Sequence, residues 1–564
     1  MTSSRAWPGL LLVALLAIAV RAPAILVATD SYRTSEAFVG EETENVRLST
    51  GMVHKHQIVP HAYEYPSLFY DVSAAVEWPL SRVAPGWRNY LIAVRCLSLL
   101  FGVATVILVG LLAARLGGPW AGWLAASIAA LDGTLIEISI QAKPNAAQVA
   151  FVAAGFLALV AFVARPRTRT AVLAAVLFAM AAASKWLGAL GLGCLALAAA
   201  LTIPVGPVAG WAHWRRVLTS VPRAHVQVLD VVAPLVVFAA VFLLFTPGVL
   251  LTPKEFGYGL GQVFFAQAAH RRALPATVSL FYLARSLGPL AVLLVAGGLA
   301  WALARIARWD GSPAKSGVAL LAAWALGYGA LVLFAFARLP SYVDLWVPPL
   351  AALAGCAWLG DDGWLRRPGA RVALLTAALV VGVWAHGADA LNRGRKVAGD
   401  VRQEASRWLE AHAADGDTVL ADEGVLLPDR LDRVWWNWWG TPPRVIYDET
   451  RTWGTDPVWP SWGGGHRRLT FENAKWSAPE SLLARRPRWV ATSQAWSEMR
   501  REGPSMFDRR LADGSAGYRE RVRLRPDPNQ LEGWSLLLRG PRPPVVFTGP
   551  EIRIYERQPA APTP

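Results

Sequence analysis

The chain has 564 residues, of which 54% are hydrophobic and only 17% are charged, and its formal net charge is +15. A mean hydropathy of +0.34 is too apolar for an ordinary water-soluble globular protein, so the composition indicates a protein that folds in a lipid bilayer. In a membrane protein, positive charge is typical of loops on the cytoplasmic side, and we predict no nucleic-acid partner.

Apolar runs of about 17 to 25 residues recur up to about residue 390, and each is long enough to cross a bilayer as a helix. The first run follows Arg5, so a cleaved signal peptide is an alternative to a first span. Lys185 interrupts the longest run, which we interpret as a turn at the membrane surface. We predict a polytopic α-helical membrane protein with about eleven transmembrane helices, at residues 7–29, 91–114, 119–137, 146–164, 170–184, 187–205, 229–251, 287–305, 317–336, 343–360 and 370–389.

The charges between the spans predict the orientation. If the N-terminus is in the cytoplasm, every inner loop is basic, whereas the first outer loop, residues 30–90, has more acids than its five bases. We therefore predict a multi-pass protein of the bacterial cytoplasmic (inner) membrane, with a transmembrane domain at residues 1–390. An odd number of spans places residues 391–564 outside the cytoplasm, and one miscounted span would place them inside.

Residues 391–564 are polar and mixed, and we predict a C-terminal soluble α/β domain there. Residues 401–414 have helical spacing, and strands are indicated at residues 417–421, 489–492 and 552–555. The segment Trp435-Trp436-Asn437-Trp438-Trp439 has two interpretations: aromatic side chains at the membrane interface, or a platform that stacks on sugar rings.

Two stretches outside the predicted spans carry residues suited to chemistry. Glu41 and Glu42 lie in the first part of the first outer loop, at the mouth of any cavity between the helices. Partial desolvation there raises a carboxylate pKa towards that of a general base; a solvated acidic loop is the alternative. A later outer loop is basic at His270-Arg271-Arg272, which breaks the inside-positive pattern and indicates an anionic ligand such as a phosphate. Arg95, Lys185 and Arg338, at predicted outer helix ends, either join that site or contact lipid headgroups.

The order of these features resembles the polyprenyl-phosphate-dependent GT-C glycosyltransferases, which include the protein O-mannosyltransferases and the bacterial aminoarabinose transferase that acts on lipid A. The resemblance covers about the first 390 residues. It is carried by the acidic pair Glu41-Glu42, by Tyr63-Glu64-Tyr65-Pro66 with Leu68, by Arg95-x-x-Ser98, by Ser184-Lys185-Trp186, and by His270-Arg271 before a helix that contains Tyr282.

The resemblance implies roles for these residues. In the family an acidic pair, usually Asp-Glu, supplies the catalytic base, which implies Glu41 first and Glu42 second; glutamate at both positions is a departure, because the extra methylene moves the carboxylate. The Phe-Glu-Lys-Pro segment of the aminoarabinose transferase contributes to a metal site with a histidine. The resemblance therefore implies Glu64 and His270 as metal ligands, with Tyr65 in place of the lysine.

The implied activity is transfer of a sugar from a polyprenyl-phosphate-linked donor to a protein, lipid or glycan acceptor on the extracytoplasmic face. Apart from a divalent metal, the resemblance implies no cofactor. A transporter or flippase for a lipid-linked or anionic solute is the alternative, and a sensor or assembly subunit is a third. The implied phosphate-binding residues are Arg95, Lys185, Arg271, Arg272 and Arg338, and the implied substrate-contacting residues are Tyr63, Tyr65 and Tyr282.

Overall fold

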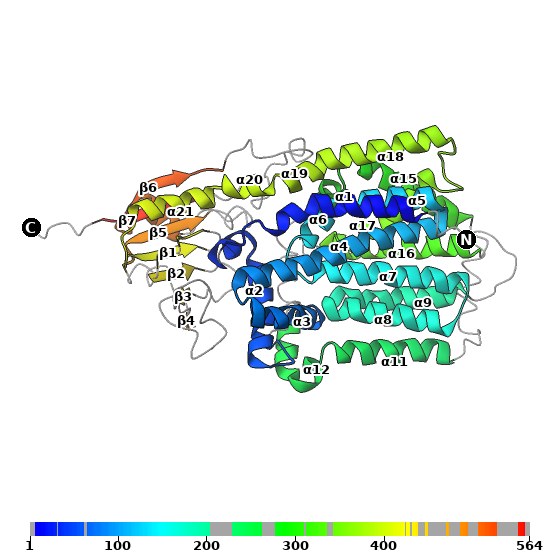
Figure 1. Cartoon of the computed structure of the whole chain (residues 1–564), viewed down its shortest axis with the longest axis horizontal. Helices are drawn as coiled ribbons and strands as arrows, with labels where there is room; N and C mark the ends of the chain where they lie inside the picture. The colour runs from blue at the N-terminus through cyan, green and yellow to red at the C-terminus, as the bar shows by residue number, and fades with distance from the viewer. Residues whose placement is uncertain are drawn as a thin grey trace, which may run out of the picture.

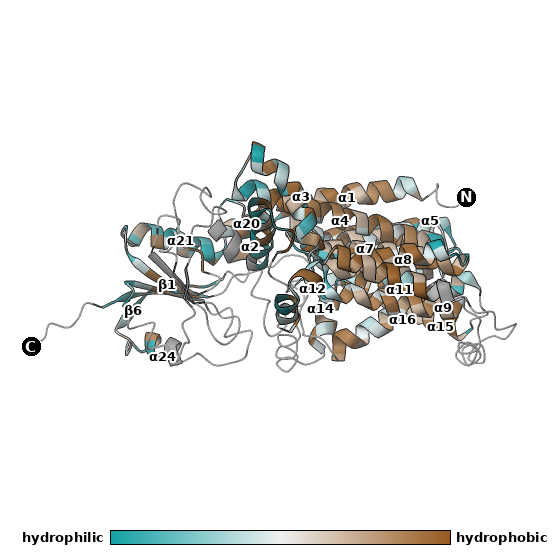
Figure 2. Cartoon of the chain, turned by 90° about the horizontal axis from the view of Figure 1, so that it is seen from below, coloured by the Kyte–Doolittle hydropathy of each residue, from teal (hydrophilic) through white to brown (hydrophobic). Residues whose placement is uncertain are grey.

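A bundle of long apolar helices lies at one end of the molecule and a β-sheet at the other (Figure 1). The bundle is hydrophobic along most of its length, whereas the segments between the bundle and the sheet are more hydrophilic (Figure 2). The computed structural model describes residues 6–30, 32–60, 65–202, 228–261, 277–308, 312–334, 342–422, 425–428, 431, 433–437, 446–448, 470–472, 486–493, 506–526 and 551–558.

Each predicted span coincides with an apolar helix or helix pair of the bundle, which confirms the polytopic helical fold. Among the described residues, six helices are long and apolar enough to cross a membrane, and a seventh span follows if the pair α5 and α6, bent by 64°, counts as one. Four further apolar helices in this part of the chain have 10–17 residues. The count of eleven therefore stays a prediction. The helices are α1 (Trp7–Ile25), α4 (Trp87–Gly117), α5 (Pro119–Leu131), α6 (Gly133–Ser139), α7 (Asn145–Ala164), α8 (Thr168–Ser184), η1 (Trp186–Leu190), α9 (Gly191–Leu201), α11 (Val228–Leu244), α15 (Pro289–Ala307), α16 (Pro313–Phe334), α17 (Val347–Leu359) and α18 (Pro368–Gly382).

The first outer loop is largely helical. It contains α2 (Tyr32–Lys55) and α3 (Leu68–Val83), which lie at the end of the bundle nearest the sheet (Figure 1). Among the described side chains of α2, the buried positions are 42–43, 45–46, 48–50 and 52–53, which together form one broad helix face. Five of these nine residues are polar, Glu42, Thr43, Asn45, Ser49 and Thr50, so a search for apolar periodicity does not detect this helix.

The C-terminal region contains the predicted α/β structure. The π-helical turn η4 (Val383–Gly387) and the helices α19 (Ala388–Leu391) and α20 (Arg393–Ala398) connect α18 to α21 (Val401–His412). The sheet has the order β4-β3-β2-β1-β5-β7-β6, with β1 parallel to both β2 and β5 and the other pairs antiparallel. The strands are β1 (Thr418–Asp422), β2 (Arg433–Asn437), β3 (Ile446–Asp448), β4 (Thr470–Glu472), β5 (Trp489–Ser493), β6 (Tyr518–Leu524) and β7 (Ile552–Arg557).

The predicted helix and three predicted strands correspond to α21, β1, β5 and β7. Apolar residues of α21, such as Ala405 and Leu409, share one buried core with Val419 of β1 and Ile554 of β7. In the tryptophan-rich segment, residues 435–437 belong to β2 and residues 438–439 lie outside the described residues. Both interpretations of that segment stay predictions, as does the division of the chain into two domains at residue 390.

Candidate active site

Glu42 on α2 and Arg95 on α4 form a buried ion pair. Arg95 Nε donates to Glu42 Oε1 and Arg95 Nη2 donates to Glu42 Oε2, both at 2.8 Å. Arg95 Nη1 donates to the carbonyl oxygens of Ile25 and Val27, at 2.9 and 2.6 Å. The guanidinium thus joins the end of α1, α2 and α4, and its nitrogens already have acceptors.

The same face of α2 is held against the turn that precedes α7. The backbone N–H of Ala142 donates to Glu42 Oε1 at 2.6 Å, and Asn45 Nδ2 donates to the carbonyl of Ala142 at 2.9 Å. The hydroxyl of Tyr70, on α3, donates to Asn45 Oδ1 at 3.1 Å. Because these polar groups are buried and paired, they fix the rotation of α2 about its axis.

Glu41 is the neighbouring residue and points to a different environment. Its side chain is 63% exposed, and its Oε2 lies 2.8 Å from Nζ of Lys143, which is 20% exposed. The charge of Lys143 lowers the pKa of Glu41, against the opposite effect of partial desolvation, and Lys185 lowers it further. Glu41 is therefore an accessible, ionised carboxylate beside two lysines, whereas Glu42 is enclosed.

Lys185 lies in the turn between α8 and η1 and is buried, at 8% exposure. Its ammonium nitrogen is 5.4 Å from the ring centroid of Tyr65 and 5.5 Å from that of Tyr342. Both rings are within the range at which an aromatic face attracts a cation. Burial lowers the pKa of Lys185, and the charges of Asp344 and Glu41 partly offset that effect.

Asp344 precedes α17 and faces the same lysine. Asn145, at the start of α7, donates through Nδ2 to Asp344 Oδ2 at 2.7 Å, and the backbone N–H of Leu345 donates to Oδ1 at 2.6 Å. Asp344 is itself buried, at 1% exposure. Three segments far apart in the sequence thus bring an acid and its fixed donors to the environment of Lys185.

This arrangement provides two of the functions needed for transfer from a phosphate. An accessible carboxylate is able to accept a proton, and ammonium groups stabilise an anion that forms beside it. We call the group formed by Glu41, Lys143, Lys185, Tyr65 and Asp344 the carboxylate–lysine site.

The structure brings some of the predicted site residues together. Glu41, Lys185 and Tyr65 belong to the carboxylate–lysine site, whereas Glu42 and Arg95 form the clamp that supports α2. Because the donors of Arg95 are engaged, this geometry favours a positioning role over contact with the donor phosphate. Tyr282 is on α14 (Thr277–Leu287) and packs, partly buried, against the bundle core. The predicted residues that lie outside the described ones are Tyr63, Glu64, His270, Arg271, Arg272 and Arg338.

Two members of the site were not predicted from the sequence, although each carries a signal. Lys143 is a basic residue in a predicted outer connection, so it breaks the inside-positive pattern in the same way as residues 270–272. Asp344 lies inside the predicted span 343–360, and an acid within a membrane span is by itself a reason to expect function.

The predicted metal ligands, Glu64 and His270, both fall outside the described residues. Within the described part of the chain, no three His, Cys, Asp or Glu side chains are grouped so that they could hold a metal ion. Glu64 and His270 as metal ligands therefore stay a prediction.

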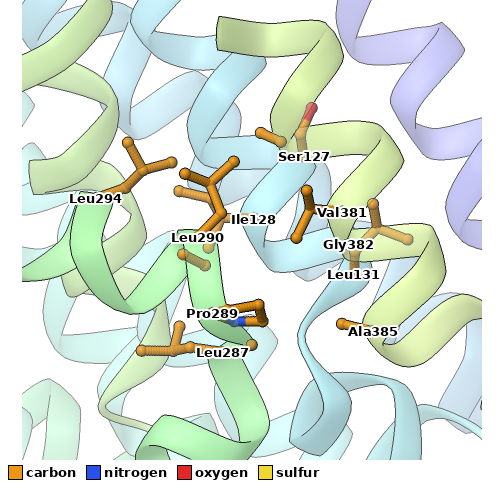
Figure 3. A pocket seen from close by; sticks show the side chains of 13 residues that line it. Ser127, Ile128, Leu131, Leu287, Pro289, Leu290, Leu294, Val381, Gly382 and Ala385 are labelled. Carbon is orange, nitrogen blue, oxygen red and sulfur yellow. The ribbon is translucent and has the colours of Figure 1, made fainter. Parts of the chain in front are cut away.

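A pocket elsewhere in the bundle is lined mostly by aliphatic side chains, including Leu131, Leu290 and Val381 from α5, α15 and α18 (Figure 3). The one hydroxyl in its lining, that of Ser127, donates to the carbonyl of Trp123 on its own helix at 2.8 Å. Since none of its lining residues is charged, this pocket lacks the groups needed for sugar or phosphate chemistry.

Comparison with known proteins gives one family match. Residues 52–252 match the family model of the dolichyl-phosphate-mannose-protein mannosyltransferases. The matched segment includes Tyr65, Arg95, Lys143 and Lys185 and begins ten residues after Glu42. No curated protein has a sequence that matches this chain.

The solved structures that match this chain share little sequence with it. ArnT from Cupriavidus metallidurans in the apo state has a TM-score of 0.48 and 13% identity, covering 96% of this chain and 97% of its own. The archaeal oligosaccharyltransferase AglB from Archaeoglobus fulgidus, in complex with an inhibitory peptide and a dolichol-phosphate, has a TM-score of 0.46 and 13% identity, covering 98% and 88%.

Proposed function

We propose that this chain is a GT-C-type membrane glycosyltransferase that transfers a sugar from a polyprenyl-phosphate-linked donor, with Glu41 as the general base. The observation that carries the proposal is the pairing of an accessible carboxylate with buried and half-buried lysines, on a chain that matches a mannosyltransferase family model over residues 52–252. The family match favours a glycosyltransferase over the alternative of a transporter or flippase.

In the proposed reaction, an acceptor hydroxyl oxygen attacks the anomeric carbon of the sugar, its proton passes to the Glu41 carboxylate, and the bond between that carbon and the phosphate oxygen breaks. The electron pair of the broken bond stays on the polyprenyl phosphate, which therefore gains negative charge. Lys185 stabilises that charge, and its partial burial strengthens the interaction because little water screens it.

The protein parts have distinct tasks in this proposal. The Glu42–Arg95 clamp fixes α2, so that Glu41 keeps its position relative to the lysines. The rings of Tyr65 and Tyr342 both attract the Lys185 ammonium and so help to position it. We further propose that the carboxylate–lysine site faces the extracytoplasmic side of a bacterial cytoplasmic membrane, as the basic inner loops predict. The acceptor is a protein, lipid or glycan of the cell envelope.

Release of polyprenyl phosphate by the purified full-length protein tests the activity. A panel of undecaprenyl-phosphate and dolichyl-phosphate sugars would be supplied with an envelope extract as the acceptor source. We expect wild-type protein to turn over at least one donor and Glu41→Gln to lose about 10²- to 10⁴-fold in kcat, the range typical of a general base. Lys315→Gln, on the inner side of the predicted topology, is the matched control and should behave as wild type.

Two outcomes would overturn the proposal. One is that wild-type protein turns over none of these donors, and the other is that Glu41→Gln retains full activity. Thermal unfolding of each variant in the same detergent shows whether a loss of activity reflects a loss of fold. A periplasmic reporter enzyme fused after residue 564 tests the orientation separately, because it is active only if the C-terminus is outside the cytoplasm.

A further inference from the structure

The proposed base is paired with a cation in the structure. Glu41 Oε2 lies 2.8 Å from Nζ of Lys143. A carboxylate in such a pair is stabilised as an anion, and Lys143 accordingly lowers the pKa of Glu41. Since a general base works best with a pKa near the operating pH, the paired carboxylate is a weak base. A productive site therefore needs Lys143 to move away from Glu41 before or during transfer.

The side chain of Lys143 is held less firmly than that of Arg95, the other cation beside Glu41 and Glu42. Arg95 is fixed by Glu42 and by two backbone carbonyls and is 3% exposed, whereas Lys143 is 20% exposed and touches Glu41 from a turn. A lysine ammonium has three donors on a flexible four-carbon stem, so it exchanges partners readily. The backbone of Lys143 is held, because its N–H donates to the carbonyl of Gln141 at 2.8 Å and Pro144 follows it.

We propose that Lys143 is a cation that changes partner: it pairs with Glu41 in the donor-free protein and moves to the phosphate when the polyprenyl-phosphate donor is bound. This inference rests on the proposed function. It makes Lys143 a second ligand of the phosphate, besides Lys185, and it makes the basicity of Glu41 depend on where Lys143 lies. Binding of the donor phosphate and release of the base become one event.

The charge changes of the reaction favour this exchange. The donor phosphate is a diester with one negative charge, and the released polyprenyl phosphate is a monoester with a charge of about −1.5 to −2 at pH 7. Its attraction for Lys143 therefore grows as the bond breaks, which is the condition for accelerating the step. Glu41 loses its own negative charge when it accepts the acceptor proton, so its attraction for Lys143 falls at the same time.

The other charged groups around this pair have partners of their own. Glu42 is paired with Arg95, and Glu137 accepts a hydrogen bond from Gln141 Nε2 at 2.6 Å and lies 3.6 Å from Arg393. Lys185 faces Asp344 and also acts on Glu41 and Lys143. In the described part of the chain, Glu41 is thus the acid that Lys143 contacts directly. The positive charge of Lys185 adds to that of Lys143, so the two lysines together attract an anion such as the donor phosphate.

The test is a double-mutant cycle on the affinity of the full-length protein for undecaprenyl phosphate, measured by calorimetry in detergent. Glu41→Gln frees Lys143, so we expect it to bind the phosphate about tenfold more tightly than wild type, as for one added charge-assisted hydrogen bond. Lys143→Gln should bind about tenfold less tightly. In the Lys143→Gln background, Glu41→Gln should gain less than about threefold, because the competing partner is already gone.

An equal gain from Glu41→Gln in both backgrounds would overturn the exchange, since it would show that Glu41 acts only by repelling the phosphate. Wild-type affinity in Lys143→Gln would also overturn it. Lys143→Arg, which keeps the charge, and Lys315→Gln are the controls, and thermal unfolding reports whether each variant is folded. Because the readout is binding, these outcomes are separate from the transfer assay: an absence of transfer would contradict the proposed function and leave this cycle interpretable.

Discussion

Arg95 and Glu42 form an ion pair through two hydrogen bonds, and their side chains are 3% and 0% exposed. The neighbouring residue, Glu41, forms its own ion pair with Lys143, but the Glu41 side chain is 63% exposed. The two adjacent glutamates on α2 should therefore differ in how much they contribute to the stability of the fold. Breaking a buried pair leaves an uncompensated charge, whereas an exposed pair contributes little to stability.

The first prediction compares these neighbours. Glu42→Gln should destabilise the protein by about 3–5 kcal/mol, and Glu41→Gln by less than about 1 kcal/mol. The measurement is the free energy of unfolding in detergent with a chemical denaturant. Equal effects of the two substitutions would contradict the assignment of Glu42 to structure and Glu41 to chemistry.

The second prediction concerns Glu77 on α3, which is fully buried and accepts hydrogen bonds from Ser49 at 2.8 Å and Thr50 at 3.2 Å. Burial raises its pKa from 4.5 to about 8. Between these values the folded protein binds more protons at this site than the unfolded chain, so this residue's contribution to stability falls as pH rises from 4.5 to 8 and is constant above.

Glu77→Gln removes the charge and keeps the shape and the hydrogen-bonding capacity. We expect it to raise Tm by several degrees at pH 8 and to change it little at pH 5, so that Tm depends less on pH than in wild type. Differential scanning calorimetry across this pH range is the measurement. A loss of Tm at pH 8 would indicate that the charged carboxylate is stabilised by its neighbours.

The third prediction concerns Asp344 and Lys185. The charge of Asp344 partly offsets the lowering of the Lys185 pKa by burial. Asp344→Asn removes that charge, so Lys185 should lose its proton at a lower pH, and the alkaline limb of kcat/KM should move to lower pH by about one unit or less, as for one neighbouring charge. Asp362→Asn, an exposed acid paired with Arg305, is the control and should leave the limb unchanged.

The positions of the apolar helices could be predicted from the sequence because each span contains a run of apolar residues. The helix that carries Glu41 could not be predicted in this way, since the polar residues Glu42, Thr43, Asn45, Ser49 and Thr50 occupy more than half of its buried positions. Several of these residues are paired with groups such as Glu77, Arg95 and Ala142, which are 27 to 100 residues away in the chain. Burial of a polar residue depends on such partners, and their location is set by the tertiary fold.

The choice between Glu41 and Glu42 shows the same limit. Both are glutamates in an acidic stretch, and the sequence orders them only through the resemblance to a family. The structure separates them by the direction in which each leaves α2: one points to α4, where Arg95 lies, and the other to the turn that carries Lys143. Lys143 itself was missed because one lysine in a short connection carries little information without knowledge of what lies opposite.

The last prediction links the C-terminal region to the proposed base. Arg402 of α21 lies with its Cζ 4.2 Å from the ring centroid of Phe38, which is one helical turn before Glu41 on α2. Arg402 is held in place by Asp400, with Nε 2.9 Å from Oδ1 and Nη2 3.0 Å from Oδ2. A cation over an aromatic ring contributes about 0.5–2 kcal/mol, so this contact is strong enough to influence the position of α2.

Phe38→Leu and Arg402→Gln should therefore each lower kcat by about 2- to 20-fold, because each removes about 1 kcal/mol of interaction energy that positions α2. Tm and the affinity for undecaprenyl phosphate should be nearly unchanged, because neither residue is a ligand of the phosphate. The double variant should be no worse than the poorer single variant, since both substitutions remove the same contact. Additive losses would mean that the two residues act independently, and wild-type kcat in both would mean that α2 needs no support from α21. Arg407→Gln, on the same helix, is the control.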